Sequence, residues 1–133
     1  MIDTPHMPVH GDRILILRWE WLLEILSGRK DLEIRGRYIR PGRIYLGCKK
    51  RIYGVADLGE PVKISNMTVW RNLMPRHRWN IDVLPYRTTY AFPLSGVQVL
   101  CGVPFEHPCG AVSIVRFRSC THIDACVASR SGR

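Results

Sequence analysis

GRKDLEIRGR (residues 28–37) surrounds two apolar residues, Leu32 and Ile34, with charged side chains of both signs. The two apolar residues alternate with Asp31, Glu33 and Arg35, and this period of two is typical of a β-strand. The sequence therefore predicts a strand over residues 31–35, anchored by its apolar face and displaying charge on the other face.

A strand and a helix are predicted before this stretch. Residues 13–18 (RILILR) form a short apolar run bounded by charge, which indicates a buried strand. Residues 19–28 then follow the spacing of one helical face, and Gly28 is suited to ending the helix. The residues expected on the apolar face are Trp19, Leu22, Leu23 and Leu26.

The rest of the chain predicts short strands and one further helix. A turn at residues 40–43 leads into strands at 44–48 and 52–59, and glycines 47 and 54 indicate bulges or close backbone approach. A helix begins after Asn66, a good N-cap, and ends at Pro75; a long loop then covers residues 75–87. Further strands are expected at residues 60–64, 88–94, 97–101 and 110–117.

These elements predict an α+β domain built on a small curled sheet or barrel, with about five to seven short strands and two or so helices. A chain of 133 residues is long enough for one domain, which we place at residues 13–117 between an extension (1–12) and a polar tail (118–133). No apolar run is long enough to span a membrane and the first residues lack a signal-peptide pattern, so we expect a cytoplasmic or nuclear protein without a membrane partner.

The five cysteines favour reduced thiols over a disulfide framework, because their number is odd and no Cys-x-x-Cys pair occurs. Cys120, His122, Asp124 and Cys126 alternate in CTHIDAC, so an extended chain would present them on one side. Structural zinc sites usually take their cysteines from turns with shorter spacings. A polar tail is the favoured interpretation, and neither a metal nor a cofactor is expected.

Charge is the strongest global signal. Twenty Lys and Arg against eleven Asp and Glu give +9, and residues 28–51 alone hold nine basic side chains against two acidic ones. Such a concentration is typical of a protein with a polyanionic partner. The alternative is a solvated basic face that serves solubility.

The same stretch carries a resemblance to a known family. Gly28, Lys30, Glu33 and Arg35 fit the motif G-x-K-x-x-E-x-R, which resembles the signature of the ASCH domain family, a branch of the PUA-like β-barrel folds. A Gly-Val-Ala strand at 54–56 and a His-Pro-x-Gly-Ala segment at 107–111 are similar in order and spacing. The resemblance covers about residues 13–117.

The resemblance implies a cleft beside the barrel that receives RNA, expected to be single-stranded, or a nucleotide-like ligand. Some relatives resemble hydrolases, and one group removes the acetyl group of N4-acetylcytidine with a Lys, a Thr three positions later and a Glu. Here Glu33 stands three positions after Lys30, which weakens that hypothesis. The alternative function is a hydrolase acting on RNA or on a modified nucleoside, with Lys30 and Glu33 as catalytic residues.

A larger set of residues is expected to contact the nucleic acid. Basic side chains are suited to phosphates and neighbouring tyrosines to stacking on bases, although some of those tyrosines are expected in the core. The predicted set is Lys30, Arg35, Arg37, Arg40, Arg43, Tyr45, Lys49, Lys50, Arg51 and Tyr53.

Several residues have two interpretations. Glu33 and Arg35 either contact a ligand or form a structural ion pair at the rim of the barrel. Lys30 is either a ligand contact or a charge that suits the end of a helix. Tryptophans 19 and 70 are expected in the core and tryptophans 21 and 79 at the surface, whereas histidines 77 and 107 show no partner in the sequence that would make them catalytic.

Overall fold

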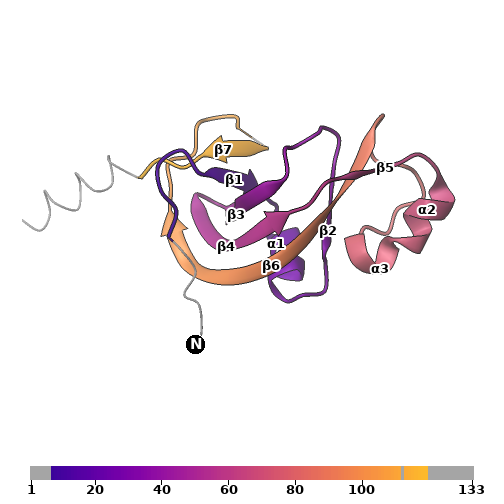
Figure 1. The fold of residues 1–133 in the computed structure, drawn as a ribbon, viewed down its shortest axis with the longest axis horizontal. Coiled ribbons are helices and arrows are strands. Elements are labelled where there is room, and N and C mark those ends of the chain that lie inside the picture. The colour runs from indigo at the N-terminus through magenta and orange to yellow at the C-terminus, as the bar shows by residue number, and fades with distance from the viewer. Residues whose placement is uncertain (1–6, 112, 120–133) are drawn as a thin grey trace, which may run out of the picture.

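The computed structural model describes residues 7–111 and 113–119. These residues form an α+β fold in which a curled sheet, a half-barrel, is covered in part by helices (Figure 1). The elements in chain order are β1 (Arg13–Ile16), α1 (Trp19–Leu26), β2 (Leu32–Arg35), β3 (Gly42–Cys48), β4 (Arg51–Leu58), β5 (Val62–Ile64), α2 (Met67–Asn72), α3 (Met74–His77), β6 (Thr89–Pro104) and β7 (Ile114–Arg116).

The sheet has the strand order β2-β6-β4-β3-β1-β7, and β5 also pairs with β6. Strands β1 and β3 are parallel, and every other pair is antiparallel. The long strand β6 joins the two parts of the sheet, because its first residues pair with β2 and β5 and its later residues pair with β4. Figure 1 shows β6 as the arc that sweeps beneath the other strands.

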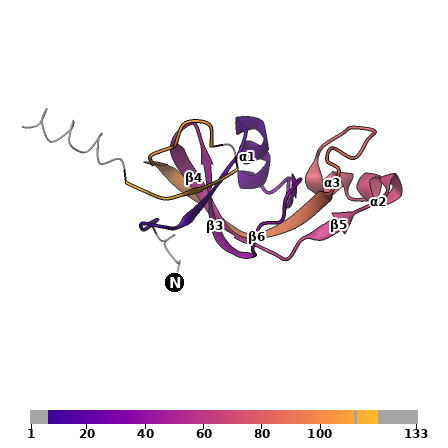
Figure 2. The same cartoon turned by 90° about the horizontal axis from the view of Figure 1, so that it is seen from above.

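The helices lie on one side of this arc. In Figure 2, α1 and the α2–α3 pair both stand above the curved β6, with β2 between them. Two apolar clusters bury the faces of the β1–β3–β4 region, and a third cluster gathers around Trp70 between β2, β5 and α2. The candidate site lies between α1, β2 and the segment that follows α3.

The predicted face of the first helix is wrong in part. The structure buries Leu22 and Ile25 in α1, whereas Trp19 and Leu23 are 39% and 43% exposed. A helix of only eight residues packs on the sheet along a narrow stripe, so an i, i+3 pair suffices to anchor it. Trp70, the other tryptophan expected in the core, is fully buried.

The predicted loop over residues 75–87 and the predicted split of the late strands are also wrong. Pro75 lies in the first turn of α3 and so begins a short helix, as its fixed φ and missing N–H allow. The strands expected at 88–94 and 97–101 are one strand, β6. Gly96 has a positive φ of 58° inside this strand, so it bends the strand and does not end it. Shifts in the β4–β6 register accommodate the bend.

Other expectations are confirmed. Asn66 caps α2 by accepting a hydrogen bond from the backbone N–H of Val69 at 2.9 Å. The pairing register shifts next to Gly47 in β3 and Gly54 in β4, as the glycines predicted. The two strands are joined by a two-residue turn, since Cys48 pairs with Arg51.

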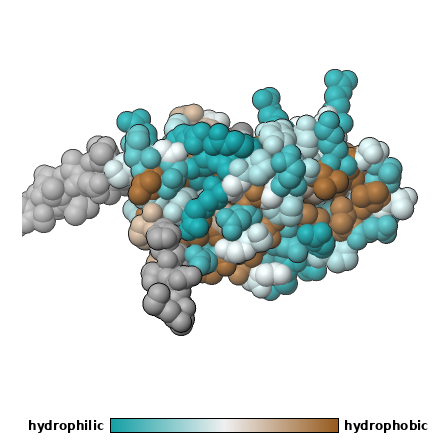
Figure 3. Space-filling model, in the orientation of Figure 1, coloured by the Kyte–Doolittle hydropathy of each residue, from teal (hydrophilic) through white to brown (hydrophobic). Residues whose placement is uncertain are grey.

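The surface in Figure 3 is mixed. Hydrophilic residues cover much of this face, and hydrophobic residues gather at the end where α2 lies. Val62 of β5 and Val69 of α2 are among the exposed apolar residues. Within the described residues, no helix is both long enough and apolar enough to cross a membrane. Cys120, His122, Asp124 and Cys126 lie outside the described residues.

Candidate functional site

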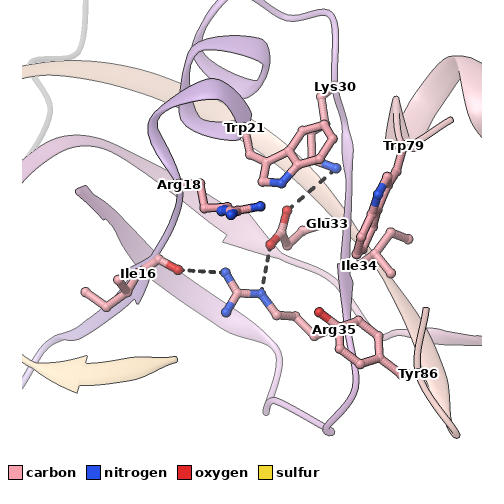
Figure 4. Close-up of a pocket in the computed structure, with 9 residues that line it drawn as sticks. All are labelled: Ile16, Arg18, Trp21, Lys30, Glu33, Ile34, Arg35, Trp79 and Tyr86. Carbon is pink, nitrogen blue, oxygen red and sulfur yellow. Dashed lines mark hydrogen bonds and ion pairs between the residues drawn. The ribbon is translucent and has the colours of Figure 1, made fainter. Parts of the chain in front are cut away.

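A pocket of about 290 Å³ opens between the start of α1, strand β2 and the segment that follows α3 (Figure 4). It has a charged floor, aromatic walls and an arginine at its edge. The residues that line it are Ile16, Arg18, Trp21, Lys30, Glu33, Ile34, Arg35, Trp79 and Tyr86.

Lys30 lies at the base of this pocket and is almost completely buried, with 3% of its surface exposed. Its Nζ donates hydrogen bonds to the backbone oxygens of Leu32 at 2.7 Å and His77 at 2.6 Å. The same Nζ lies 3.6 Å from Oε1 of Glu33 and 4.8 Å from the centre of the Trp21 ring. The ammonium group therefore ties β2 to the end of α3.

Glu33 is the central group of the floor. It is 4% exposed, so β2 does not display this charge at the surface as the alternating pattern predicted. One carboxylate oxygen faces Lys30, and the other accepts a hydrogen bond from Nε of Arg35 at 2.8 Å. Arg35 also donates from Nη2 to the backbone oxygen of Ile16 at 2.7 Å. Figure 4 shows the three charged groups in one row from Lys30 to Arg35.

Burial and charge act in opposite directions on Lys30. Removal from water lowers the pKa of the Lys30 ammonium below its ordinary value, and attraction by Glu33 offsets part of that effect. Two of the three N–H bonds of the ammonium group are used by backbone oxygens, and Glu33 lies at ion-pair distance from the same nitrogen. Two hydrogen bonds and an ion pair thus hold the Lys30 side chain at the floor of the pocket.

Three aromatic rings form the walls. The rings of Trp21 and Trp79 have centroids 5.9 Å apart at an interplanar angle of 53°, and Tyr86 packs edge-on to Trp79 at 6.2 Å. Trp21 and Trp79 are half-buried and Tyr86 is 41% exposed, so each presents part of a ring to the pocket. Such walls suit a flat ligand ring.

His77 holds Trp79 in place. Its ring is fully buried, stacks on Trp70 at 3.9 Å and lies 2.9 Å from the backbone oxygen of Trp70 through Nε2. Nδ1 accepts a hydrogen bond from the backbone N–H of Trp79, which assigns the proton of a neutral ring to Nε2. Burial lowers the pKa of His77, and the nearby charge of Lys30 acts in the same direction. His77 is therefore a supporting residue behind the pocket wall.

The structure brings three of the predicted site residues together in the pocket, Lys30, Glu33 and Arg35. Arg37 lies in an adjoining hollow. The other predicted contacts do not line either space, which does not agree with a single hollow shared by the whole basic set. They are Arg40, Arg43, Tyr45, Lys49, Lys50, Arg51 and Tyr53.

These outlying residues have their own surroundings. Tyr45 is 3% exposed and packs in an apolar cluster, so its ring is not presented to a base. Tyr53 is half-buried against Trp19 at 5.2 Å. Lys49 and Lys50 are exposed at the tip of the β3–β4 turn, and Arg51 beside them donates to the backbone oxygen of Gly102.

Six of the nine pocket residues were not in the predicted site set: Ile16, Arg18, Trp21, Ile34, Trp79 and Tyr86. Arg18 precedes α1, is exposed, and approaches only Glu20 of the described acidic residues, at 3.8 Å. The sequence places Arg18 at the end of a predicted buried strand, and residues in the connections that follow such strands commonly line binding sites. This position could have identified Arg18 as a site residue. Tyr86 gave no such signal, since its position depends on contacts with distant residues.

The described residues contain no group of three or more His, Cys, Asp or Glu side chains placed to hold a metal ion. The pocket floor has one carboxylate between two cations, which is an unsuitable donor set for a cation. The chemistry of the pocket is therefore that of hydrogen bonding, charge and aromatic contact.

Comparison with known proteins gives a fold. No family model and no curated protein sequence matches the chain. Among solved structures, the crystal structure of ASCH from Zymomonas mobilis matches with a TM-score of 0.65 at 20% identity, covering 89% of this chain and 94% of that one. Two single-residue variants of that protein match equally, with TM-scores of 0.64 and 0.65 at 20% identity, covering 92% and 89% of this chain and 98% and 97% of theirs. The chain thus has the curled α+β fold of the ASCH domain structures, as its motif predicted.

Proposed function

We propose that this protein binds RNA or a nucleotide by taking one unpaired nucleobase into the pocket beside the half-barrel. The observation that carries the proposal is a buried carboxylate next to an arginine at the base of a pocket with aromatic walls. A nucleobase has the same combination of features, a flat apolar face and an edge with donors and acceptors.

The floor offers both kinds of hydrogen-bonding group. Glu33 accepts, and Arg35 donates. An edge with an amino group beside a carbonyl or ring nitrogen, as in adenine, cytosine or guanine, meets these requirements best.

The aromatic walls favour an unstacked base over a base inside a duplex. Base–aromatic stacking contributes about 1–3 kcal/mol for each base, and it requires access to the face of the ring. A pocket of about 290 Å³ has no room for a base pair with its backbones. We therefore assign single-stranded RNA or a free nucleotide as the ligand.

The net charge of +9 supports a polyanionic ligand. Arg18 stands at the pocket edge as a phosphate contact. Arg40, Arg43 and the exposed tip at residues 49–51 are outlying cations for a longer strand. Because each neutralised phosphate releases counterions, we expect affinity for RNA to fall as salt rises.

Isothermal titration with the four 5′-nucleoside monophosphates, single-stranded RNA and the matching duplex tests this function. We expect binding of at least one nucleotide and of the single strand, with weaker binding of the duplex. Trp79→Leu is expected to weaken nucleotide binding about tenfold through lost stacking. Trp19→Leu, outside the pocket, is the matched control. Equal loss in both variants, or no nucleotide binding by the folded protein, contradicts the proposal.

Hydrolysis of RNA or of a modified nucleoside is the second candidate. In its favour, the pocket holds an amine of lowered pKa 3.6 Å from a carboxylate. Against it, Lys30 already donates two hydrogen bonds to buried backbone oxygens and pairs with Glu33. Incubation with N4-acetylcytidine and with labelled RNA separates the two functions, because turnover that Glu33→Gln abolishes requires the hydrolase.

A further inference from the structure

A second hollow adjoins the pocket on the far side of Arg35. Its volume is about 300 Å³, and it shares two lining residues with the pocket, Arg35 and Tyr86. The remaining lining residues are Gly36, Arg37, Ile39 and Ser113. The two spaces are therefore neighbours that meet along one arginine and one aromatic ring.

The backbone explains why the two hollows meet at this point. Ile16 ends β1, and its N–H donates to the backbone oxygen of Ser113 while its oxygen accepts from Arg35. The ends of β1 and β2 and the residue before β7 are thus linked through one residue. Arg35 crosses this junction with its guanidinium between the pocket and the second hollow.

Arg35 has hydrogen-bonding capacity left over. Nε donates to Glu33 and Nη2 to Ile16, and within the described residues no partner is recorded for Nη1. In Figure 4 the guanidinium nitrogen without a dashed line lies on the side away from Glu33. A guanidinium with a free edge is suited to a phosphate oxygen.

Tyr86 is the second residue, beside Arg35, that lines both hollows. Its ring packs on Gly36, where a Cβ would lie only 2.7 Å from Cδ1 of the tyrosine. The absence of a side chain at Gly36 therefore allows the Tyr86 ring to pack closely against the end of β2.

Arg37 supplies a further cation in the second hollow. Its side chain is exposed, and no ion pair or hydrogen bond is recorded for it among the described residues. Two arginines two residues apart and a serine give this largely apolar hollow a positive charge. It lacks the buried carboxylate of the pocket, so it matches a phosphodiester and sugar better than the edge of a base.

We propose that the second hollow is a subsite for the nucleotide that adjoins the pocket-bound base, with Arg35 and Arg37 on the phosphodiester between them. This inference rests on the proposed function and deepens it. Its consequence is that the ligand is an oligonucleotide, since a free nucleoside or nucleotide fills only the first space.

Titration with mononucleotides and dinucleotides tests the subsite. The probes are the four 5′-nucleoside monophosphates and the four matching dinucleoside monophosphates. A dinucleoside monophosphate carries one negative charge, whereas a nucleotide carries nearly two at neutral pH, so tighter binding of the dinucleotide cannot come from net charge. We expect the dinucleotide to bind at least tenfold more tightly than its nucleotide.

Arg37→Gln is the diagnostic variant, and Arg118→Gln is its control. Arg118 is an exposed arginine beyond β7, at the end of that strand opposite Ser113. We expect Arg37→Gln to weaken dinucleotide binding at least fivefold more than nucleotide binding, and Arg118→Gln to weaken both equally. Nucleotide binding without any gain for the dinucleotide overturns the subsite alone. No binding of either probe overturns the proposed function itself. A gain that Arg37→Gln leaves intact also overturns the subsite.

Discussion

At the scale of single residues, Lys30 is the group on which the pocket floor depends. Its ammonium satisfies two buried backbone oxygens and balances the buried carboxylate of Glu33. Removing one partner of a buried ion pair leaves the other charge uncompensated, which is far more destabilising than the loss of a surface pair. The role of Lys30 is therefore structural first, and it holds Glu33 in position at the floor of the pocket.

We expect Lys30→Met to lower the free energy of unfolding by about 3 kcal/mol, because the side chain fits while its charge and donors are lost. Urea unfolding followed by fluorescence measures this change. The control is Arg29→Gln, one residue earlier, whose pair with Glu24 at 2.6 Å is exposed at the arginine and is expected to contribute less than about 1 kcal/mol. Similar stabilities for the two variants would contradict the structural role.

His77 predicts an acid-sensitive fold. Because burial lowers its native pKa, the native and unfolded states are both neutral above the ordinary value of about 6.5, and the stability from neutral His77 is complete there. As the pH falls below that value, the unfolded state binds a proton and the native state does not, so stability decreases until the lowered native pKa is passed.

The measurement is the free energy of unfolding between pH 8 and 4.5 for the protein and for His77→Asn. We expect the decrease between pH 6.5 and 5 to be smaller in the variant, whatever its stability at pH 8. Parallel curves for the two proteins would show that His77 is not the titrating group.

Sequence reasoning recovered the charged residues of the floor but not their burial. A period of two puts Glu33 and Arg35 on the same side of a strand, so their pairing follows from local geometry. Burial depends on Trp21 from α1 and Trp79 from the segment after α3, which cover that side. The positions of these two tryptophans depend on the tertiary fold, and no pattern within residues 28–37 predicts them.

At the scale of elements, the contact between the end of β2 and Tyr86 sets the shape of the site. We expect Gly36→Ala to displace the tyrosine ring and to weaken nucleotide binding at least threefold. Its cost in stability should be under about 1 kcal/mol, because Tyr86 is 41% exposed and can move outward. Titration and thermal unfolding measure the two effects.

Gly59→Ala is the matched control, since its Cβ would lie equally close to Pro93, 2.7 Å from Cγ, away from both hollows. Weaker binding in both alanine variants would mean that general strain is responsible, and the local explanation would be wrong.

The β3–β4 turn makes a separate prediction about stability. Lys49 and Lys50 have φ values of 51° and 66°, a region that favours Asn and Gly in two-residue hairpins. We expect Lys49→Asn with Lys50→Gly to raise the free energy of unfolding by about 1 kcal/mol by relieving this conformation. The control is Lys49→Gln with Lys50→Gln, which removes the same charges and keeps the strained backbone. Equal stabilisation by both pairs would assign the effect to charge repulsion.

The elements that sequence reasoning placed well are those with local signals. Asn66 capped its helix, and glycines 47 and 54 marked the register shifts, because capping and backbone freedom act over a few residues. The continuity of β6 was missed because Gly96 resembles a strand end, and only pairing with β4 on its far side shows that the strand goes on. Pro75 was misassigned for a similar reason, since proline ends one helix and begins another equally well.

At the scale of the whole molecule, charge and shape act at different ranges. The net charge of +9 comes from basic side chains spread along the chain, and a field of this sign acts over long range. The half-barrel and its helices leave one pocket in which a carboxylate, two arginines and three rings converge. Composition predicted the first property. The second required the fold, because its residues come from separate parts of the chain that meet at the junction of β1 and β2.

The most direct test of the central claim is a crystal structure of the protein with its best-binding 5′-nucleotide. We predict the base in this pocket, in contact with the rings of Trp21 and Trp79, with its edge facing Glu33 and Arg35 and its phosphate toward the arginines at the rim. A nucleotide bound only elsewhere, such as at the Lys49–Lys50 turn, with the pocket left to solvent, would contradict the account.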